Sequence, residues 1–239
     1  MILCANPNAQ YLSYRDEIDN AIKRVLESKQ YILGSEVENL ENEIAKYIGC
    51  SSVIGVANGT DAIELSLRAL DIGFGDEVIT VSHTAIATIA AIECTGAKPI
   101  LVDIETEFYT INPDLIEKAI TNKTKAIIVV HLYGQSANLD EIIKICNKND
   151  VFLIEDVSQA HGAKYKNLKL GNYGVVGCFS CYPTKNLGAI GDAGLVTTNN
   201  KKLGEKIKYL REYGWKKKNN SILSGRNSRL DEVQASILR

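Results

Sequence analysis

The chain has no long hydrophobic segment, few prolines and aromatic residues, and no excess of charge of either sign. Charged residues interrupt its apolar runs well before the roughly 18 residues that a membrane-spanning helix needs. With 27 Lys and Arg against 29 Asp and Glu, the formal net charge of −2 gives no net attraction to a nucleic-acid backbone or an anionic membrane. The 239 residues therefore predict a soluble globular protein that binds neither nucleic acid nor membrane.

The chain also lacks the features of a secreted or metal-binding protein. Residues 1–10 carry no basic residue before their short apolar stretch and reach Pro7 at once, unlike a secretory signal. The six cysteines are scattered, as in reduced cytosolic proteins, so we expect a cytoplasmic location. Cys178 and Cys181 have C-x-x-C spacing, but they have no second pair and lie in a strand-like run, where such positions face opposite ways. We therefore expect buried thiols and no metal site.

Short β-branched and apolar runs recur along the chain, at 52–57, 77–82, 99–103, 125–131, 151–156, 175–181 and 194–198. Each run is nearly continuous in apolar residues, which is typical of strands buried on both faces. Helical spacing separates most of the runs, at 61–70, 84–94 and 138–149, and amphipathic helices are also predicted at 14–28, 35–47, 201–213 and 229–239. The alternation predicts an α/β fold with a mostly parallel seven-stranded sheet flanked by helices.

Ligands of open parallel sheets bind beyond the carboxyl ends of the strands, so the residues after each run are the candidates for a site. The first run is followed by Asn58-Gly59-Thr60-Asp61, a glycine-containing turn that opens a helix. The free N–H groups and positive end of such a helix favour a bound phosphate. Asp61 with Glu64 three residues later also fits an ordinary helix cap, so these residues alone leave both interpretations open.

A carboxylate pair closes the fifth run, at Glu155 and Asp156. Adjacent strand residues face opposite ways, so one of the two points toward the functional edge of the sheet. A carboxylate at the end of an apolar strand needs a cationic or hydrogen-bonding partner. A bound cation and a structural Arg both meet that need.

Lys185 follows the sixth run and precedes the glycines Gly188, Gly191 and Gly194. A single lysine in a glycine-rich segment indicates a nucleophilic amine held beside a ligand, although a flexible surface loop is the alternative. A phosphate cradle, a strand-end acid and a lone lysine at one sheet edge are together what pyridoxal 5′-phosphate requires.

A series of motifs now identifies a family. They appear in the order Asn-Gly-Thr-Asp-Ala (58–62), Gly-Asp-Glu-Val-Ile (75–79), His-Thr-Ala-Ile-Ala-Thr (83–88), His-Leu-Tyr-Gly-Gln (131–135), Ile-Glu-Asp-x-x-Gln-Ala-His-Gly (154–162), Tyr-Pro-Thr-Lys-Asn-Leu-Gly (182–188), Gly-Asp-x-Gly (191–194) and Asn-Ser-Arg-Leu-Asp-Glu-x-Gln-Ala (227–235). From about residue 11 to residue 239 the chain resembles the DegT/DnrJ/EryC1/StrS aminotransferases. These are pyridoxal-phosphate sugar transaminases with the aspartate-aminotransferase fold, fold type I.

The resemblance implies a role for each matching residue. Lys185 forms the Schiff base with the cofactor and then moves protons. Asp156 pairs with the pyridinium nitrogen while Glu155 faces elsewhere, and Gln159 contacts the 3-oxygen of the ring. The residues that hold the phosphate are Gly59, Thr60, Ser180 and, from the partner subunit of a homodimer, Asn227.

One motif departs from the family pattern. Many relatives carry an aromatic residue after the Thr of the third motif, stacked on the cofactor ring, whereas this chain has Ala85. We expect His83 to supply the stacking face, with a neutral core histidine as the alternative. The Asp61 side chain is not assigned to the phosphate, because its charge would repel that anion.

The resemblance implies transfer of an amino group, expected to come from glutamate, to a keto sugar carried on a nucleotide. A sugar dehydratase on the same fold is an alternative, but in that branch a His replaces the Schiff-base Lys, so Lys185 weighs against it. A cofactor-binding fragment or regulatory protein without turnover is another alternative. Relatives continue with a small C-terminal domain, and the last predicted helix has no Gly or Asn stop signal. We expect residues 1–239 to be an N-terminal segment plus the cofactor-binding large domain.

Overall fold

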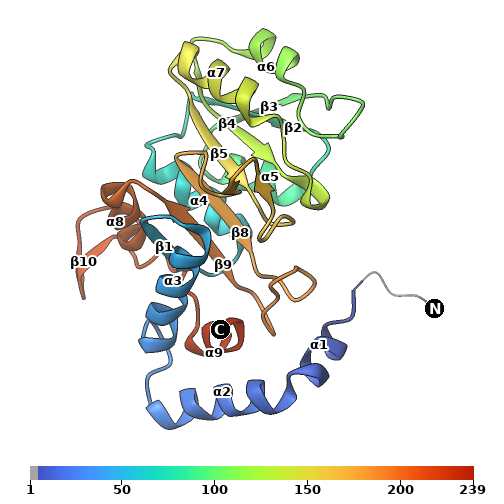
Figure 1. Ribbon diagram of the computed structural model, residues 1–239. Coiled ribbons are helices and arrows are strands. Elements are labelled where there is room, and N and C mark those ends of the chain that lie inside the picture. Colours follow the sequence, from blue (N-terminus) through green and yellow to red (C-terminus); the bar gives the residue numbers. More distant parts are fainter. Residues whose placement is uncertain (1–4) are drawn as a thin grey trace.

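The computed structural model describes residues 5–239, and a seven-stranded sheet forms its centre (Figure 1). The strand order is β1-β9-β8-β5-β4-β2-β3. The strands are β1 (Ser52–Val56), β2 (Glu77–Val81), β3 (Lys98–Val102), β4 (Thr124–Val130), β5 (Phe152–Asp156), β8 (Val176–Ser180) and β9 (Gly194–Thr198). Each coincides with one apolar run of the sequence, with no end displaced by more than one residue. The expectation for Cys4 lies outside the described residues.

The direction of the strands brings several loops to one edge of the sheet. β2, β3, β4, β5 and β8 are parallel to their neighbours in this group. β9 is antiparallel to both β1 and β8. The residues that precede β9 therefore lie at the same edge as those that follow β1 and β8. The predicted mostly parallel sheet is confirmed, with β9 as its antiparallel member.

Helices cover both faces of the sheet, which explains the lack of polar alternation in the strands. One face packs against α4 (Gly59–Ala69), α5 (Ile86–Cys94) and α8 (Lys201–Leu210). The other packs against α3 (Ser35–Ile48), α6 (Pro113–Ala119), α7 (Leu139–Asn149) and α9 (Glu232–Leu238). Successive strand residues divide between the two cores: Leu153 belongs to the second and Ile154 to the first.

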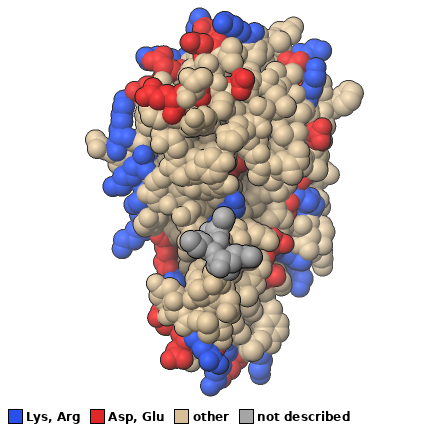
Figure 2. Space-filling view, turned by 90° about the vertical axis from the view of Figure 1, so that its right-hand side faces the viewer, with Lys and Arg blue, Asp and Glu red and all other residues tan. Residues whose placement is uncertain are grey.

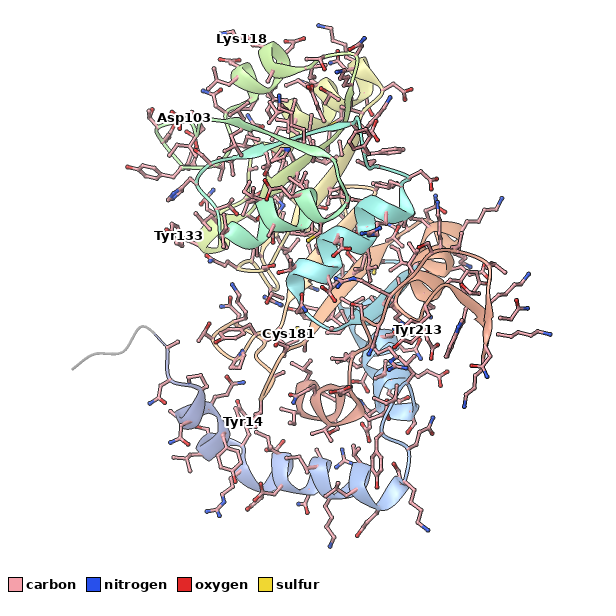
Figure 3. All side chains as sticks on the ribbon, turned by 180° about the vertical axis from the view of Figure 1, so that it is seen from behind. Tyr14, Asp103, Lys118, Tyr133, Cys181 and Tyr213 are labelled. Atoms are coloured by element: carbon pink, nitrogen blue, oxygen red, sulfur yellow. The ribbon has the colours of Figure 1, made fainter. Side chains whose placement is uncertain are left out.

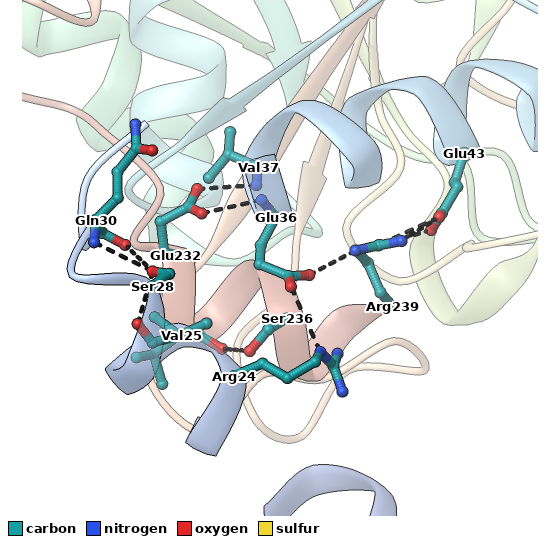
Figure 4. A network of polar contacts seen from close by, with 11 residues as sticks. Arg24, Val25, Ser28, Gln30, Glu36, Val37, Glu43, Glu232, Ser236 and Arg239 are labelled. Atoms are coloured by element: carbon teal, nitrogen blue, oxygen red, sulfur yellow. Dashed lines mark hydrogen bonds and ion pairs between the residues drawn. The ribbon is translucent and has the colours of Figure 1, made fainter. Parts of the chain in front are cut away.

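The N-terminal helices α1 (Pro7–Ser13) and α2 (Arg15–Ser28) lie away from the sheet, and α9 lies between α2 and the rest of the chain (Figure 1). The buried Glu232 carboxylate accepts the N–H groups of Gly34, Glu36 and Val37 at 2.8 to 2.9 Å (Figure 4). These are among the free donors at the start of α3, so the first residue of α9 caps α3. Arg239 adds ion pairs to Glu36 and Glu43 (Figure 4).

The predicted helices form, but the helix predicted at 201–213 ends at Leu210, and the last helix starts later than expected. The spacing predicts a helix from 229, whereas α9 begins at Glu232. Leu230 is buried against Gly55, where an added Cβ would lie 2.9 Å from its Cδ2, and Asp231 bridges to Ile32. This extended segment is fixed by tertiary packing, which helical spacing does not report.

Several short elements have no counterpart in the predictions. These are α1, α6, the 3₁₀ turn η1 (Leu132–Gly134), the pair β6 (Lys164–Tyr165) and β7 (Leu168–Lys169), and the pair β10 (Trp215–Lys217) and β11 (Asn220–Ser221). The basic residues 216–218 are exposed on this last hairpin. Within residues 5–239, no helix is long and apolar enough to cross a membrane.

Candidate active site

The start of α4 meets the end of β8 at the strand-end edge. An added Cβ on Gly59 would lie 2.6 Å from the Ser180 Cβ, so only glycine permits this approach. The Asn58 side-chain oxygen accepts the N–H of Asp61 at 2.8 Å, so Asn58 is the helix cap and the alternative with Asp61 as the cap is wrong. In the described part of the chain, the N–H groups of Gly59 and Thr60 have no acceptor. This helix end is therefore ready to bind an anion.

The acidic residues near the start of α4 are paired with arginines. Asp61 and Glu64 are both buried, and Arg226 forms ion pairs with each, at 2.8 Å to Glu64. Arg68 also pairs with Glu64 at 2.8 Å. The Asp61 charge is thus compensated by a fixed cation, and repulsion of an anion at Gly59 and Thr60 is reduced.

Glu155 and Asp156 end β5 on opposite faces of the sheet, and Glu155 is fully satisfied. It is 0% exposed and accepts the N–H groups of Gly171, Tyr173 and Gly174 at 2.8 to 2.9 Å. Its fourth partner is His131 Nε2 at 3.1 Å. His131 Nδ1 accepts the N–H of Ala137, so Nε2 carries the hydrogen that is donated to Glu155. Strand alternation predicts that the two carboxylates face opposite ways, and their separate partners agree with it.

Asp156 faces α5 and has far fewer partners. Its Oδ2 accepts the Thr88 hydroxyl and its Oδ1 accepts the Ser158 N–H, both at 3.1 Å. The carboxylate is 6% exposed, and no Lys, Arg or His in residues 5–239 forms an ion pair with it. A buried anion with only two neutral donors retains free lone pairs and an uncompensated charge. A protonated ring nitrogen fits this requirement; a structural Arg, the other interpretation from sequence, is absent from the described contacts.

Lys185 lies in a tight loop after β8. Its backbone N–H donates to the Tyr182 carbonyl at 2.8 Å, its side chain is half-buried, and an added Cβ on Gly188 would lie 2.6 Å from the Pro183 oxygen. The loop is therefore closely folded, contrary to the interpretation as a flexible surface segment.

His161 belongs to the motif at 154–162, has no role predicted from the sequence, and lies near Lys185. Both of its ring nitrogens are buried and have no hydrogen-bond partner among residues 5–239. Burial, and after it the positive charge of Lys185, lowers the pKa of His161 to about 4. The imidazole is neutral at neutral pH, and its unpartnered nitrogens are a second unsatisfied feature of this edge.

Gln159 and His83 meet through Tyr133, a residue with no predicted role. The Gln159 side-chain oxygen accepts the Tyr133 N–H at 3.0 Å, and the rings of His83 and Tyr133 make an edge contact at 5.9 Å. Tyr133 is 75% exposed and, like Cys181, lies at the strand-end side of the sheet (Figure 3). His83 is half-buried, and its stacking role stays a prediction.

Asn227 is placed apart from the other predicted residues. It is exposed, and its side-chain oxygen accepts the Arg229 Nε–H at 2.9 Å. No hydrogen bond in the described chain joins it to Gly59, Thr60 or Ser180. Its expected contact with the phosphate belongs to a second subunit and stays a prediction.

The cysteine pair behaves as buried thiols. Cys178 belongs to the core on the α4 side, 3.5 Å from the Ser66 hydroxyl, whereas Cys181 belongs to the opposite core. Burial raises the pKa of Cys181 to about 12 and also raises that of Cys178. The two thiols lie on opposite faces, as the strand spacing predicts, so one metal ion could not hold both.

A groove of about 1180 Å³ runs beside the Lys185 loop, bounded by α1, α2 and α9. Its walls include Pro183 and Asn186 but neither Asp156 nor the start of α4. Exposed apolar side chains also surround the strand-end edge. Ile86 follows β2, Tyr133 follows β4, and Tyr182 and Ile190 follow β8. The space-filling view shows a broad face with few charges (Figure 2).

Comparison with known proteins identifies the family of the chain. Residues 13–239 match the model of the DegT/DnrJ/EryC1/StrS aminotransferase family. The chain is 52% identical over 227 residues to the dTDP-3-amino-3,6-dideoxy-α-D-galactopyranose transaminase of Aneurinibacillus thermoaerophilus, covering 95% of this chain and 62% of that protein. It thus spans about three fifths of the length of the curated relatives it matches.

Solved structures share the fold. The crystal structure of Streptomyces venezuelae DesV in complex with a ketimine intermediate matches with a TM-score of 0.96 at 45% identity, covering 98% of this chain and 63% of that one. Bacillus subtilis NtdA with bound cofactor PMP matches with a TM-score of 0.91 at 35% identity, covering 95% of this chain and 52% of that one. The fold is that of the fold type I aminotransferases, and the chain belongs to the DegT/DnrJ/EryC1/StrS aminotransferase family.

Proposed function

We propose that the chain is the cofactor-binding part of a sugar aminotransferase, which moves an amino group from glutamate to a nucleotide-linked keto sugar with pyridoxal 5′-phosphate. The observation that carries this proposal is the buried Asp156 carboxylate, at the edge that also presents Lys185. Among residues 5–239 it has two neutral donors and no ion pair with a cation. The names printed for the relatives support the substrate class. The covered share of those relatives supports a cofactor-binding large domain within a longer enzyme.

The residues present fit the phosphate of the cofactor. The unpaired N–H groups of Gly59 and Thr60 and the hydroxyl of Ser180 would bind it at the positive end of α4. Asn227 of the partner subunit would add an amide. Arg226 forms an ion pair with Asp61 and would thereby reduce the repulsion between the Asp61 carboxylate and the phosphate.

The remaining residues fit the ring of the cofactor. When bound, pyridoxal 5′-phosphate supplies an aldehyde that condenses with amines and a pyridine ring that accepts electron density. Asp156 would keep the ring nitrogen protonated, Gln159 would orient the 3-oxygen, and His83 would pack against the ring. Lys185 supplies the amine that holds the cofactor, and then takes up and returns the proton that moves between the substrate and cofactor carbons.

A homodimer completes this proposal. The exposed apolar residues after β2, β4 and β8 surround the site and favour contact with another protein surface. A second copy on this edge would cover those side chains and bring Asn227 to the phosphate. The free thiols of Cys50, Cys94, Cys146, Cys178 and Cys181 fit a cytoplasmic enzyme.

The test is covalent labelling followed by turnover. The purified protein is incubated with pyridoxal 5′-phosphate, reduced with borohydride and digested, and mass spectrometry locates the pyridoxyl group. We expect the group on Lys185 and its loss in Lys185→Ala, with Lys169→Ala as a control that keeps it. The unreduced protein is then given glutamate and nucleotide-linked 3-keto and 4-keto sugars. Absence of both label and aminated sugar contradicts the proposal.

A further inference from the structure

Thr88 is the one side chain that forms a hydrogen bond with the Asp156 carboxylate among the described residues. It lies in the first turn of α5, is 0% exposed, and its Oγ1 is 3.1 Å from Asp156 Oδ2. Near the start of a helix its hydroxyl can bond outside the helix, whereas Ser66 within α4 donates to the Ala62 carbonyl four residues earlier. The Thr88 hydroxyl is therefore directed at Asp156 rather than at its own helix.

The carboxylate fixes the direction of this bond and of a second bond behind it. Thr84 Oγ1 lies 2.9 Å from Thr88 Oγ1. A hydroxyl has one hydrogen, and an ionised carboxylate only accepts, so Thr88 must donate to Asp156. Thr84 must then donate to Thr88. The two threonines form a short chain of donors that ends on Asp156 Oδ2.

The other carboxylate oxygen is also held. Asp156 Oδ1 accepts the Ser158 N–H at 3.1 Å. With one neutral donor on each oxygen, the plane of the carboxylate is fixed, while no ion pair within the described part of the chain compensates its charge. Thr88 is stiff because its Cβ is branched and its side chain is buried. The geometry thus orients Asp156 and leaves free lone pairs for a cationic ligand.

We propose that Thr88 is the positioning residue for the ring nitrogen of the cofactor, and that Thr84 supports it. This inference rests on the proposed function, because the ring nitrogen is the group that the oriented Asp156 would receive. The effect of Thr88 is specific to that nitrogen, since its hydroxyl reaches the cofactor only through Asp156.

The test compares two cofactors in one set of variants. Pyridoxal 5′-phosphate and its 1-deaza analogue, in which a C–H replaces the ring nitrogen, are titrated into wild type, Thr88→Val, Thr88→Ser and Thr84→Val. Thr88→Val keeps the branched shape and removes the hydroxyl. We expect it to weaken pyridoxal 5′-phosphate binding about tenfold, since a hydrogen bond to a charged group is removed, and to leave analogue binding unchanged. Thr88→Ser should restore the affinity, and Thr84→Val should show a smaller loss.

Thr80→Val is the matched control. Thr80 is 0% exposed, and its hydroxyl donates to the Ile128 carbonyl at 3.0 Å instead of to Asp156. It should change the affinity for the two cofactors equally or not at all. Circular dichroism checks folding, and if Thr88→Val does not fold, the comparison of Thr84→Val with Thr80→Val decides.

The outcomes separate the two proposals. If wild type binds the cofactor but Thr88→Val weakens both cofactors equally, or neither, the role of Thr88 is overturned and the proposed function stands. If wild type binds neither cofactor, both proposals are overturned. A loss confined to pyridoxal 5′-phosphate, with rescue by Thr88→Ser, supports the role of Thr88.

Discussion

The two adjacent carboxylates of β5 lie on opposite faces of the strand and differ in how many hydrogen bonds they accept. Glu155 accepts four hydrogen bonds and is closed to ligands, so it holds the segment from Gly171 to Gly174 against the strand. Asp156 accepts two and keeps its capacity for a cation. Both are buried, so burial alone does not distinguish a structural acid from one that binds a ligand. The number of hydrogen bonds that each carboxylate accepts distinguishes the two.

The largest predicted effect is on folding stability and comes from the loss of Glu155. Glu155→Ala leaves the His131 ring and three backbone N–H groups without their buried acceptor. We expect a loss of unfolding free energy on the order of 3 to 5 kcal/mol, measured by urea denaturation. If the protein does not fold, Glu155→Gln should show a smaller loss. The comparison fails if Asp156→Ala destabilises the protein as much as Glu155→Ala does.

The next effect concerns pH and the unpartnered His161. Its pKa falls from an ordinary value of 6.5 to about 4 in the folded chain. Between these values the unfolded chain binds a proton that the folded chain does not, so stability decreases as the pH falls from 6.5 to 4, by on the order of 3 kcal/mol in all. Above this window the imidazole is neutral in both states, and below it both are protonated. His161→Leu should flatten this part of the stability curve; an unchanged slope would refute the assignment.

A smaller effect is expected at Asp156, and it concerns cofactor binding rather than folding. Asp156→Asn removes the charge but keeps a side chain of similar shape. We expect unfolding free energy to change by no more than about 1 kcal/mol, because a buried uncompensated charge is lost together with its hydrogen bonds. Affinity for pyridoxal 5′-phosphate should fall at least about tenfold, measured by absorbance titration. Equal affinities in wild type and variant would count against Asp156 as the partner of the ring.

The smallest effect is expected for an exposed ion pair, which serves as a reference for the changes in unfolding free energy. Glu141 and Lys144 form an ion pair at 3.0 Å on the exposed face of α7, with side chains 51% and 71% exposed. Glu141→Gln should change unfolding free energy by no more than about 0.5 kcal/mol in the same urea assay. A loss close to that of Glu155→Ala would mean that charge, rather than burial with satisfied donors, decides the difference between the acids.

The sequence predicts the sheet well, because strands buried on both faces leave continuous apolar runs. It does not predict the β10 and β11 hairpin, whose exposed polar residues have no hydrophobic period. It also misplaces the start of α9, because Leu230 and Asp231 are held by contacts with Gly55 and Ile32 that lie far away in the chain.

The candidate site also has features that the sequence predicts and features that it does not. Strand alternation separates Glu155 from Asp156 without saying which one faces the edge, and the family motif predicts Asp156. Thr88 was missed because its hydroxyl meets a residue 68 positions away. His161 belongs to a family motif, but the motif does not show that its ring nitrogens lack hydrogen-bond partners within residues 5–239. Motifs identify residue types, while hydrogen-bond partners depend on the fold.

The protonation state of the bound ring nitrogen tests the central claim most directly. Pyridoxal 5′-phosphate labelled with ¹⁵N at the ring is bound to wild type and to Asp156→Asn, and the ¹⁵N chemical shift is measured at neutral pH. The shift of a protonated ring in wild type and of a neutral ring in Asp156→Asn is the predicted result. A neutral ring in wild type, or a protonated ring in Asp156→Asn, would contradict the claim that Asp156, which keeps free lone pairs, holds the ring nitrogen of the cofactor.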